Sequence, residues 1–314
     1  MRVLCLLAAA LLQGQEPPKP PDPTAAPGEA KPEAPAKPVY RNEGKPILLP
    51  FTCGEEDIQA FGLTCTSDEP CEAYLELSAI DTFNGKLYVT GNIHTSATTL
   101  WSVLLMSEDE GKTWSEAYER MRSTALEHMQ FLDLDYGWIS GQTLLSLPKD
   151  PFLLATTDGG RIWRRKPVSG ESRVGAIENF VMESRTTGQL LIDRTQTGDS
   201  GGRHEYFETN TGGDTWGLRQ VSPKPIVLRK TRPVSSILRI QADARTKSFR
   251  LERRDAQRWV PLASFLVKVG ECKTSDELRE PPPPPTEEAQ PDLGTFVIPS
   301  ERGPRRPPSL KKKK

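Results

Sequence analysis

Three eight-residue segments share one pattern and limit what this chain can fold into. Their sequences are SEDEGKTW at residues 107–114, TTDGGRIW at 156–163 and TNTGGDTW at 209–216. Each has Ser or Thr first, Gly fifth and Trp eighth, and each stands between short apolar runs that are typical of strands. The glycine allows the positive φ of a turn, and the hydroxyl can bond to turn backbone groups. We therefore predict that each segment closes a β-hairpin.

The third position of the pattern differs between the segments. Asp109 and Asp158 fill it in the first two, whereas Thr211 stands there in the third. We expect the polar side chains to bond to the turn backbone and the tryptophan ring to be buried beneath the turn. The residues so predicted to have a structural role are Ser107, Asp109, Gly111, Trp114, Thr156, Asp158, Gly160, Trp163, Thr209, Gly213 and Trp216.

The spacing of these segments predicts the fold class. Their tryptophans are 49 and 53 residues apart, and Trp259 follows after a further 43. A period of about 40 to 55 residues built from short strands indicates propeller blades. We predict an all-β chain, a β-propeller of about four blades at residues 73–120, 126–170, 174–222 and 226–268. A fifth blade stays open as an alternative, because residues 40–72 could supply another strand.

One stretch between the first two predicted blades has no clear assignment. Residues 123–130, STALEHMQ, are compatible with a helical turn, but their apolar spacing is too short to decide.

Proline marks the limits of the folded part. Of 29 prolines, 11 lie in residues 15–50 and 10 in residues 281–308. Proline-rich, charged segments with few large apolar side chains bury too little surface to offset the entropy of ordering. We predict a disordered linker at 15–45, a propeller domain at 46–272 and a disordered tail at 273–314 with a basic end.

The N-terminus predicts export from the cytoplasm. Residues 1–14 have one basic residue and then an apolar run from Val3 to Leu12. This pattern fits a secretory signal peptide and is too short for a membrane span, which needs about 20 apolar residues. We expect a secreted or periplasmic protein without a transmembrane segment.

Four cysteines remain after such a leader: Cys53, Cys65, Cys71 and Cys272. An even number in an oxidising compartment indicates disulfides, and four cysteines allow three pairings, which stay open. Because three of them cluster, we expect at least one bridge from that cluster to Cys272. The cysteine spacings do not suit a zinc site and the chain has three histidines, so we expect neither a metal nor another cofactor.

Charge points to a possible binding surface. The formal net charge of −1 argues against a specific nucleic-acid binder. Four arginines that are close in sequence, Arg161, Arg164, Arg165 and Arg173, form a candidate patch for an acidic protein or another anionic polymer. An ordinary solvated strand face is the alternative explanation. The partner and the oligomeric state stay open.

The repeated pattern resembles the Asp-box, also known as the BNR repeat. The stretch from MQFLDLDYGWISG to LLATTDGGRIW, residues 129–163, resembles the propeller family of photosystem II assembly and stability factors and its secreted bacterial relatives. The resemblance extends over about residues 74–220. It implies a non-catalytic module for protein interaction or assembly outside the cytoplasm, so that no enzyme activity is expected.

Asp-boxes also occur in sialidases, which gives an alternative function. A sialidase-like glycoside hydrolase needs an arginine triad, a tyrosine nucleophile paired with a glutamate, and an aspartic acid. No tyrosine of this chain can be placed in such a pairing, and no Arg-Ile-Pro-like segment precedes the first box. The alternative therefore remains a hydrolase of this kind or a glycan-binding lectin in the cell envelope.

The pentapeptide GDSGG at residues 198–202 resembles the nucleophile segment of chymotrypsin-like proteases. A protease would need a histidine base and an orienting carboxylate. The histidines ahead of Ser200 stand in unrelated contexts, and the pentapeptide falls between two strands of the third predicted blade. We predict a hairpin loop there, and we expect Ser200→Ala to change neither fold nor function.

Overall fold

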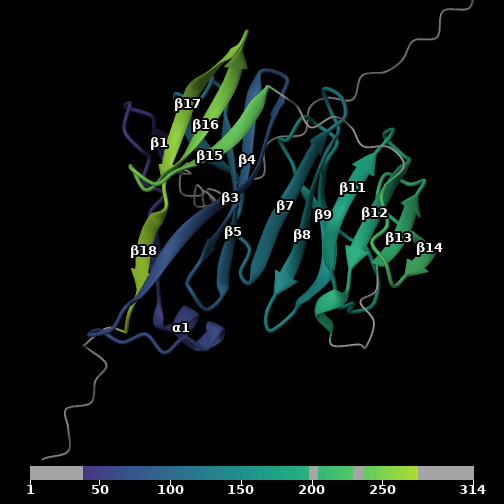
Figure 1. Ribbon diagram of the computed structural model, residues 1–314, viewed down its shortest axis with the longest axis horizontal. Helices are drawn as coiled ribbons and strands as arrows, with labels where there is room; N and C mark the ends of the chain where they lie inside the picture. Colours follow the sequence, from purple (N-terminus) through teal and green to yellow (C-terminus); the bar gives the residue numbers. More distant parts are fainter. Residues whose placement is uncertain (1–37, 198–203, 229–236, 275–314) are drawn as a thin grey trace, which may run out of the picture.

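The computed structural model describes residues 38–197, 204–228 and 237–274 (Figure 1). These residues form 18 strands, one α-helix and one 3-10 helix, so the predicted all-β fold class is confirmed. No helix within these three ranges is long and apolar enough to cross a membrane. The predicted signal peptide, the GDSGG pentapeptide and the tail beyond residue 274 lie outside the described residues.

The strands form four antiparallel sheets, apart from one parallel pair in the first. The first sheet has the order β1-β6-β5-β4-β3-β18-β2, and the second, third and fourth contain β7–β10, β11–β14 and β15–β17. The bounds in the first sheet are β1 Val39–Arg41, β2 Phe51–Cys53, β3 Cys71–Phe83, β4 Lys86–His94, β5 Thr99–Ser107, β6 Thr113–Tyr118 and β18 Lys268–Cys272. Those in the second and third are β7 Thr124–Phe131, β8 Gly137–Leu144, β9 Pro148–Thr156, β10 Arg164–Pro167, β11 Ala176–Met182, β12 Gly188–Asp193, β13 His204–Thr209 and β14 Gly217–Ser222. The fourth has β15 Leu238–Asp243, β16 Ser248–Asp255 and β17 Arg258–Leu266, and the helices are α1 Glu55–Phe61 and η1 Thr195–Thr197.

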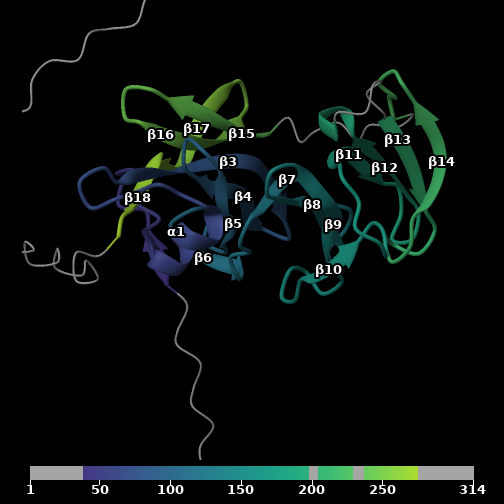
Figure 2. The same cartoon turned by 90° about the horizontal axis from the view of Figure 1, so that it is seen from below.

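The sheets pack face to face in the order fourth, first, second, third (Figure 2). A hydrophobic cluster fills each of these three interfaces, with Phe265 and Trp114 in the first, Tyr88 and Phe152 in the second, and Trp138 in the third. The first strands of the sheets are neighbours, because β3 contacts both β15 and β7, and β7 contacts β11. This is the arrangement of blades in a β-propeller. Within the described ranges, no hydrophobic cluster joins the third sheet to the fourth.

The first strands of three sheets each carry a β-bulge. The pairing shifts between Leu77 and Ala79 in β3, between Leu126 and Met129 in β7, and between Ile177 and Asn179 in β11. The β7 bulge falls inside STALEHMQ, so the helical turn considered for that stretch is wrong. Pairing with β8 holds it extended, with Leu126 packed against the first sheet and Gln130 donating to Met182 O of the third. A bulge redirects side chains locally.

The repeated segments form the β5–β6, β9–β10 and β13–β14 connections. In the first, Ser107 Oγ accepts from Gly111 N–H at 2.8 Å, and Asp109 Oδ1 accepts from Thr113 N–H at 2.8 Å. Thr156 and Thr209 accept in the same way from Gly160 N–H and Gly213 N–H, at 2.9 and 3.1 Å. The fifth-position glycines have φ values of 89°, 81° and 89°, which favour glycine. The eighth-position rings are buried in the first two segments and half-buried in the third.

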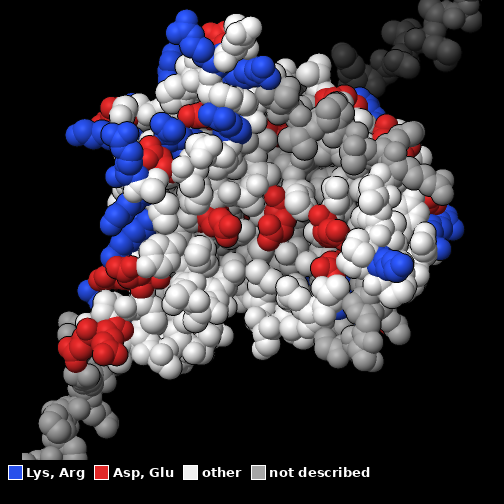
Figure 3. Space-filling view, viewed as in Figure 1, with Lys and Arg blue, Asp and Glu red and all other residues white. Residues whose placement is uncertain are grey.

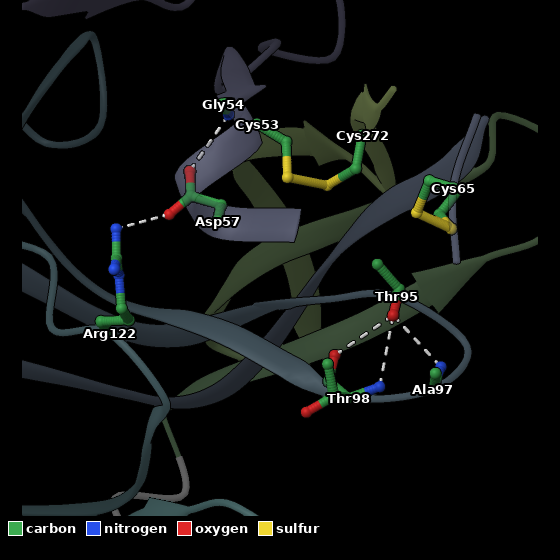
Figure 4. Close-up of a disulfide and its surroundings, with 10 residues drawn as sticks. Cys53, Gly54, Asp57, Cys65, Thr95, Ala97, Thr98, Arg122 and Cys272 are labelled. Carbon is green, nitrogen blue, oxygen red and sulfur yellow. Dashed lines mark hydrogen bonds and ion pairs between the residues drawn. A yellow bond between two sulfur atoms is a disulfide. The ribbon is translucent and has the colours of Figure 1, made fainter. Parts of the chain in front are cut away.

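Two disulfides fix the start and the end of the described chain. Cys53 pairs with Cys272 and Cys65 with Cys71, so the expected bridge to Cys272 is confirmed. Figure 4 shows the Cys53–Cys272 bridge beside α1. Cys53 and Cys272 are also partners in the parallel pairing of β2 with β18.

One predicted limit of the domain changes. Val39–Arg41 falls within the linker predicted at 15–45, yet it forms β1 and pairs with β6, placing Tyr40 opposite Trp114. Tyr40 is buried, and its hydroxyl donates to Glu116 at 3.0 Å. The ordered domain therefore begins earlier than residue 46, because strand pairing, the buried Tyr40 ring and hydrogen bonds from Asn42 to Gly111 O and Leu262 O hold this segment.

Candidate functional site

Three glutamates occupy related places on the first strands of neighbouring sheets. They are Glu76 on β3, Glu127 on β7 and Glu178 on β11, and 51 residues separate each from the next. Glu127 and Glu178 stand in the bulges, and Glu76 precedes the β3 bulge. Figure 3 shows a row of acidic side chains across the middle of one face, where Figure 1 places these strands. We call Glu76, Glu127 and Glu178 the glutamate row.

The middle glutamate of the row, Glu127, has a raised pKa. Burial raises the pKa of Glu127, and the negative charge of Glu76 raises it further. Its Oε1 accepts a hydrogen bond of 3.4 Å from Gln142 Nε2 on β8. Gln142 is 4% exposed, and its own Oε1 is buried without a partner among the described atoms. A buried amide oxygen without a donor is costly, so Gln142 contributes an unsatisfied polar group beside the row.

Two histidines border the third glutamate. His204 at the start of β13 is buried, and its Nδ1 lies 3.3 Å from Glu178 Oε2. Desolvation by the surrounding sheets lowers the pKa of His128, although its ring reaches solvent, and a hydrogen bond to the backbone of Glu178 opposes this shift. His128 is therefore mostly neutral near pH 7 and adds little positive charge to the row.

The row has two chemical capabilities. Neighbouring carboxylates attract a cationic group, and the partial burial of Glu127 strengthens the attraction at the middle of the row. A carboxyl with a raised pKa, such as that of Glu127, is also suited to general acid catalysis. In the described ranges, no group of three or more His, Cys, Asp or Glu side chains is placed to hold a metal ion.

Next to the row, a buried carboxylate is fully occupied by arginines. Glu205 on β13 is 3% exposed. Its Oε2 accepts a hydrogen bond from Arg173 Nη2 at 2.6 Å, and its Oε1 accepts one from Arg194 Nη1 at 3.2 Å. Arg173 also lies over the ring of Phe207, 5.3 Å from its centroid. A buried carboxylate needs such partners to offset its lost hydration. These arginines therefore serve the packing of the second sheet against the third.

The predicted arginine patch is not one surface. Arg173 is engaged by Glu205, and Arg165 stacks over the Phe152 ring at 4.0 Å. Arg161 precedes β10 and Arg173 follows it, so these two lie at opposite ends of the strand. Arg164 and Arg165 are successive strand residues and point to opposite faces. Proximity in sequence does not bring the four side chains together, because β10 is extended and alternates its faces.

The sequence analysis did not select the glutamate row, although the sequence carries its signal. The triplets Leu75–Leu77, Leu126–His128 and Ile177–Asn179 each consist of an aliphatic residue, a glutamate and a third residue, at a constant spacing. Alignment on the hairpin tryptophans hides this spacing, because the connections between strands differ in length. Alignment on the first strand of each sheet reveals it.

Comparison with known proteins gives matches among solved structures alone. No protein-family model matches the chain, and no curated protein matches it. The Penicillium chrysogenum α-L-arabinanase complexed with arabinobiose is 14% identical over 72% of this chain and 66% of its own, with a TM-score of 0.33. YCF48 bound to a D1 peptide is 15% identical over 63% of this chain and 54% of its own, with a TM-score of 0.31. An ulvan lyase of polysaccharide lyase family PL25 is 10% identical over 65% of this chain and 53% of its own, with a TM-score of 0.34.

These matches correct one prediction and support no assignment. The chain spans about half to two thirds of the length of these proteins, and TM-scores below 0.5 carry no conclusion about activity. The expectation that the chain is not an enzyme is nevertheless contradicted, because two of the three proteins are enzymes by their titles.

Proposed function

We propose that the chain is an extracytoplasmic binding module of the β-propeller kind, which takes part in protein assembly. In this proposal the glutamate row binds a basic segment of a partner protein. The observation that carries the proposal is the recurrence of Glu76, Glu127 and Glu178 at one place on three neighbouring first strands. The two disulfides support a location in an oxidising compartment.

The charges around the row favour a cationic partner. Gln142 and the largely neutral His128 add polar groups and little positive charge beside the row, while the ring of His204 contacts Glu178. The nearby arginines Arg173 and Arg194 are already paired with Glu205. Complementary charge speeds association and fixes orientation, and salt weakens it when the pairs are exposed.

A basic peptide tests this proposal directly. We expect an oligolysine peptide to bind the disulfide-bonded protein in low salt. We expect the triple variant Glu76→Gln, Glu127→Gln and Glu178→Gln to weaken that binding at least tenfold, measured by isothermal titration calorimetry. The matched control is Glu43→Gln, Glu119→Gln and Glu171→Gln, which removes the same charge from exposed positions elsewhere. Equal affinities of the two triple variants would reject the row as the binding surface.

The raised pKa of Glu127 favours a second candidate function, hydrolysis of a glycoside. A carboxyl that keeps its proton can protonate the leaving oxygen, while a second carboxyl group, that of Glu76, takes the role of base or nucleophile. Release of reducing ends from a panel of polysaccharides tests it. Activity should disappear in Glu127→Gln and survive in Gln220→Leu, a control on the exposed strand β14. If Glu127→Gln retains full activity, the row does not supply the acid.

A further inference from the structure

A polar pocket of about 510 Å³ lies on the third sheet, beside its hairpin segment. The start of β12, the end of β13 and the start of β14 line it, with Glu183, Gln189, Glu208, Asn210, Trp216 and Arg219 among the lining residues. Its volume lies within the range of about 300–1,000 Å³ that is usual for small-molecule sites. The pocket is at the opposite end of β12 from the position that pairs with the β11 bulge, so it is separate from the glutamate row.

The pocket lies where the third sheet departs from the repeat. In each sheet the first residue of the hairpin segment pairs with a residue of the preceding strand. The residue that follows this partner is Tyr88 on β4, Trp138 on β8 and Gln189 on β12. The Tyr88 hydroxyl donates to Gly159 O at 3.2 Å, and Trp138 Nε1 donates to Gly212 O at 3.2 Å. Both rings are thus covered by the hairpin of the next sheet. Gln189 has a polar side chain, and in the described residues no such hairpin covers it.

The polar groups of the pocket are arranged to receive hydroxyl groups. Gln189 Nε2 donates to Glu183 Oε1, while Gln189 Oε1 is buried and has no donor among the described atoms. The Asn210 side chain is exposed, and none of the described hydrogen bonds involves it. Trp216 is half-buried, whereas Trp114 and Trp163 are 1% and 5% exposed. An indole that is partly accessible beside free amide groups offers an apolar surface together with hydrogen-bonding partners.

The charges of the pocket exclude an acidic ligand. Glu183 and Glu208 outnumber Arg219, and Arg219 Nε already donates to Glu208 Oε2 at 3.0 Å. A carboxylate or sulfate on the ligand would be repelled by the glutamates and would find no unpaired guanidinium. A ring with apolar C–H faces and uncharged hydroxyl edges fits both the indole and the amides. We propose that this pocket binds a neutral saccharide.

An array of neutral and acidic oligosaccharides, probed with the disulfide-bonded protein, tests the proposal. We expect binding to neutral saccharides, followed by calorimetry with the best of them. Gln189→Leu keeps the shape of the side chain and removes the acceptor, and Asn210→Ala removes the free amide. Each should weaken binding at least tenfold, while Gln220→Leu on β14, which does not line the pocket, should leave it unchanged.

Several results would overturn this proposal. They are an array without any neutral binder, a preference for acidic saccharides, or wild-type affinity of Gln189→Leu. Circular dichroism and the melting temperature identify a variant that fails to fold, and the second variant Asn210→Ala then decides, because its side chain is exposed and makes no described contact. The triple glutamine variant of the glutamate row should bind the saccharide normally, so the two proposals can fail independently.

Discussion

The first and third sheets contain the same hairpin pattern in different surroundings. In the first, Asp109 accepts from Thr113 N–H, and Trp114 is covered by Phe265 of the fourth sheet. In the third, Thr211 Oγ1 accepts from Thr215 N–H at 2.9 Å in place of the carboxylate, and Trp216 is half-buried. The turn therefore forms with either side chain. Burial of the tryptophan depends on the neighbouring sheet and not on the pattern itself.

This difference shows how one repeat can serve two purposes. Where another sheet covers the hairpin and the face beside it, the repeat builds the core. Where that cover is missing and Gln189 replaces an aromatic residue, the same geometry leaves a pocket of about 510 Å³. A position that is apolar in two sheets and polar in the third is thus more informative about ligand binding than the pattern that all three share.

The largest expected effect concerns the Cys53–Cys272 disulfide at the edge of the first sheet. Replacement of both Cys53 and Cys272 by Ala should lower the free energy of unfolding by about 5 kcal/mol, because the bridge restricts a long loop of the unfolded chain. The Cys65–Cys71 bridge closes a loop with a sequence separation of 6. Replacement of both cysteines by Ala should therefore lower the free energy of unfolding by about 2 kcal/mol. Urea unfolding measures both. Equal losses from the two pairs would contradict this explanation.

The next largest effect is the difference in stability loss between replacement of Trp114 and replacement of Trp216. Trp114→Ala should cost about 3–5 kcal/mol, because it removes a fully buried ring and leaves a cavity beside Phe265. Trp216→Ala should cost less than about 2 kcal/mol, because its ring is already partly in water. Thermal unfolding followed by circular dichroism gives the two values. Similar losses would show that the third sheet is packed as tightly as the first.

The carboxylate of the first hairpin should contribute about 1–2 kcal/mol, comparable to a helix cap. Burial acts to raise the pKa of Asp109, but hydrogen bonds from Thr113 and Ser107 outweigh it and lower the pKa. The stability that these bonds give is present above the pKa that Asp109 has in the unfolded chain. It is lost as the pH falls through the lower pKa that Asp109 has in the folded protein. Asp109→Asn should thus destabilise at pH 7 and converge with wild type in acid. Thr211→Asn, the control in the third hairpin, should show no such pH dependence.

The smallest effect concerns Glu127. Because its folded pKa is raised, the folded state holds the proton more tightly, and stability falls as pH rises from the unfolded pKa through the folded one. Glu127→Gln removes this cost. We therefore expect the free energy of unfolding to rise by no more than about 1 kcal/mol at pH 7 and to stay unchanged below about pH 4. Glu119→Gln, an exposed control, should change little at either pH. A loss at pH 7 in Glu127→Gln would mean that the carboxylate stabilises the fold.

The sequence predicted the parts of this structure that depend on local chemistry. Gly111 and Ser107 must meet in a tight turn, and the apolar runs on either side alternate as strands do, so the hairpins could be inferred. Three cysteines lie close together in sequence and the fourth is Cys272, so a bridge from the group of three to Cys272 could be inferred as well. Both inferences use contacts that are close in sequence or a residue type with one strong preference.

The rest depends on how the sheets stack, which the sequence pattern does not encode directly. Arg161 and Arg173 were grouped because they are close in sequence, but strand β10 separates them. Glu205 was not selected, because its importance comes from two arginines that only the fold brings to it. Glu127 was missed because its stretch was considered as a helical turn, whereas pairing with β8 makes it a strand with a bulge.

The Cys53–Cys272 bridge makes one covalent ring of nearly all the described chain, with the two cysteines 219 positions apart. A protease that cuts once inside this ring opens a backbone but releases no fragment. The two pieces stay joined through the sulfurs, and the pairing of β2 with β18 keeps the new molecule in register. A nicked protein of this kind would keep its mass, apart from one added water, until a reductant separates the pieces.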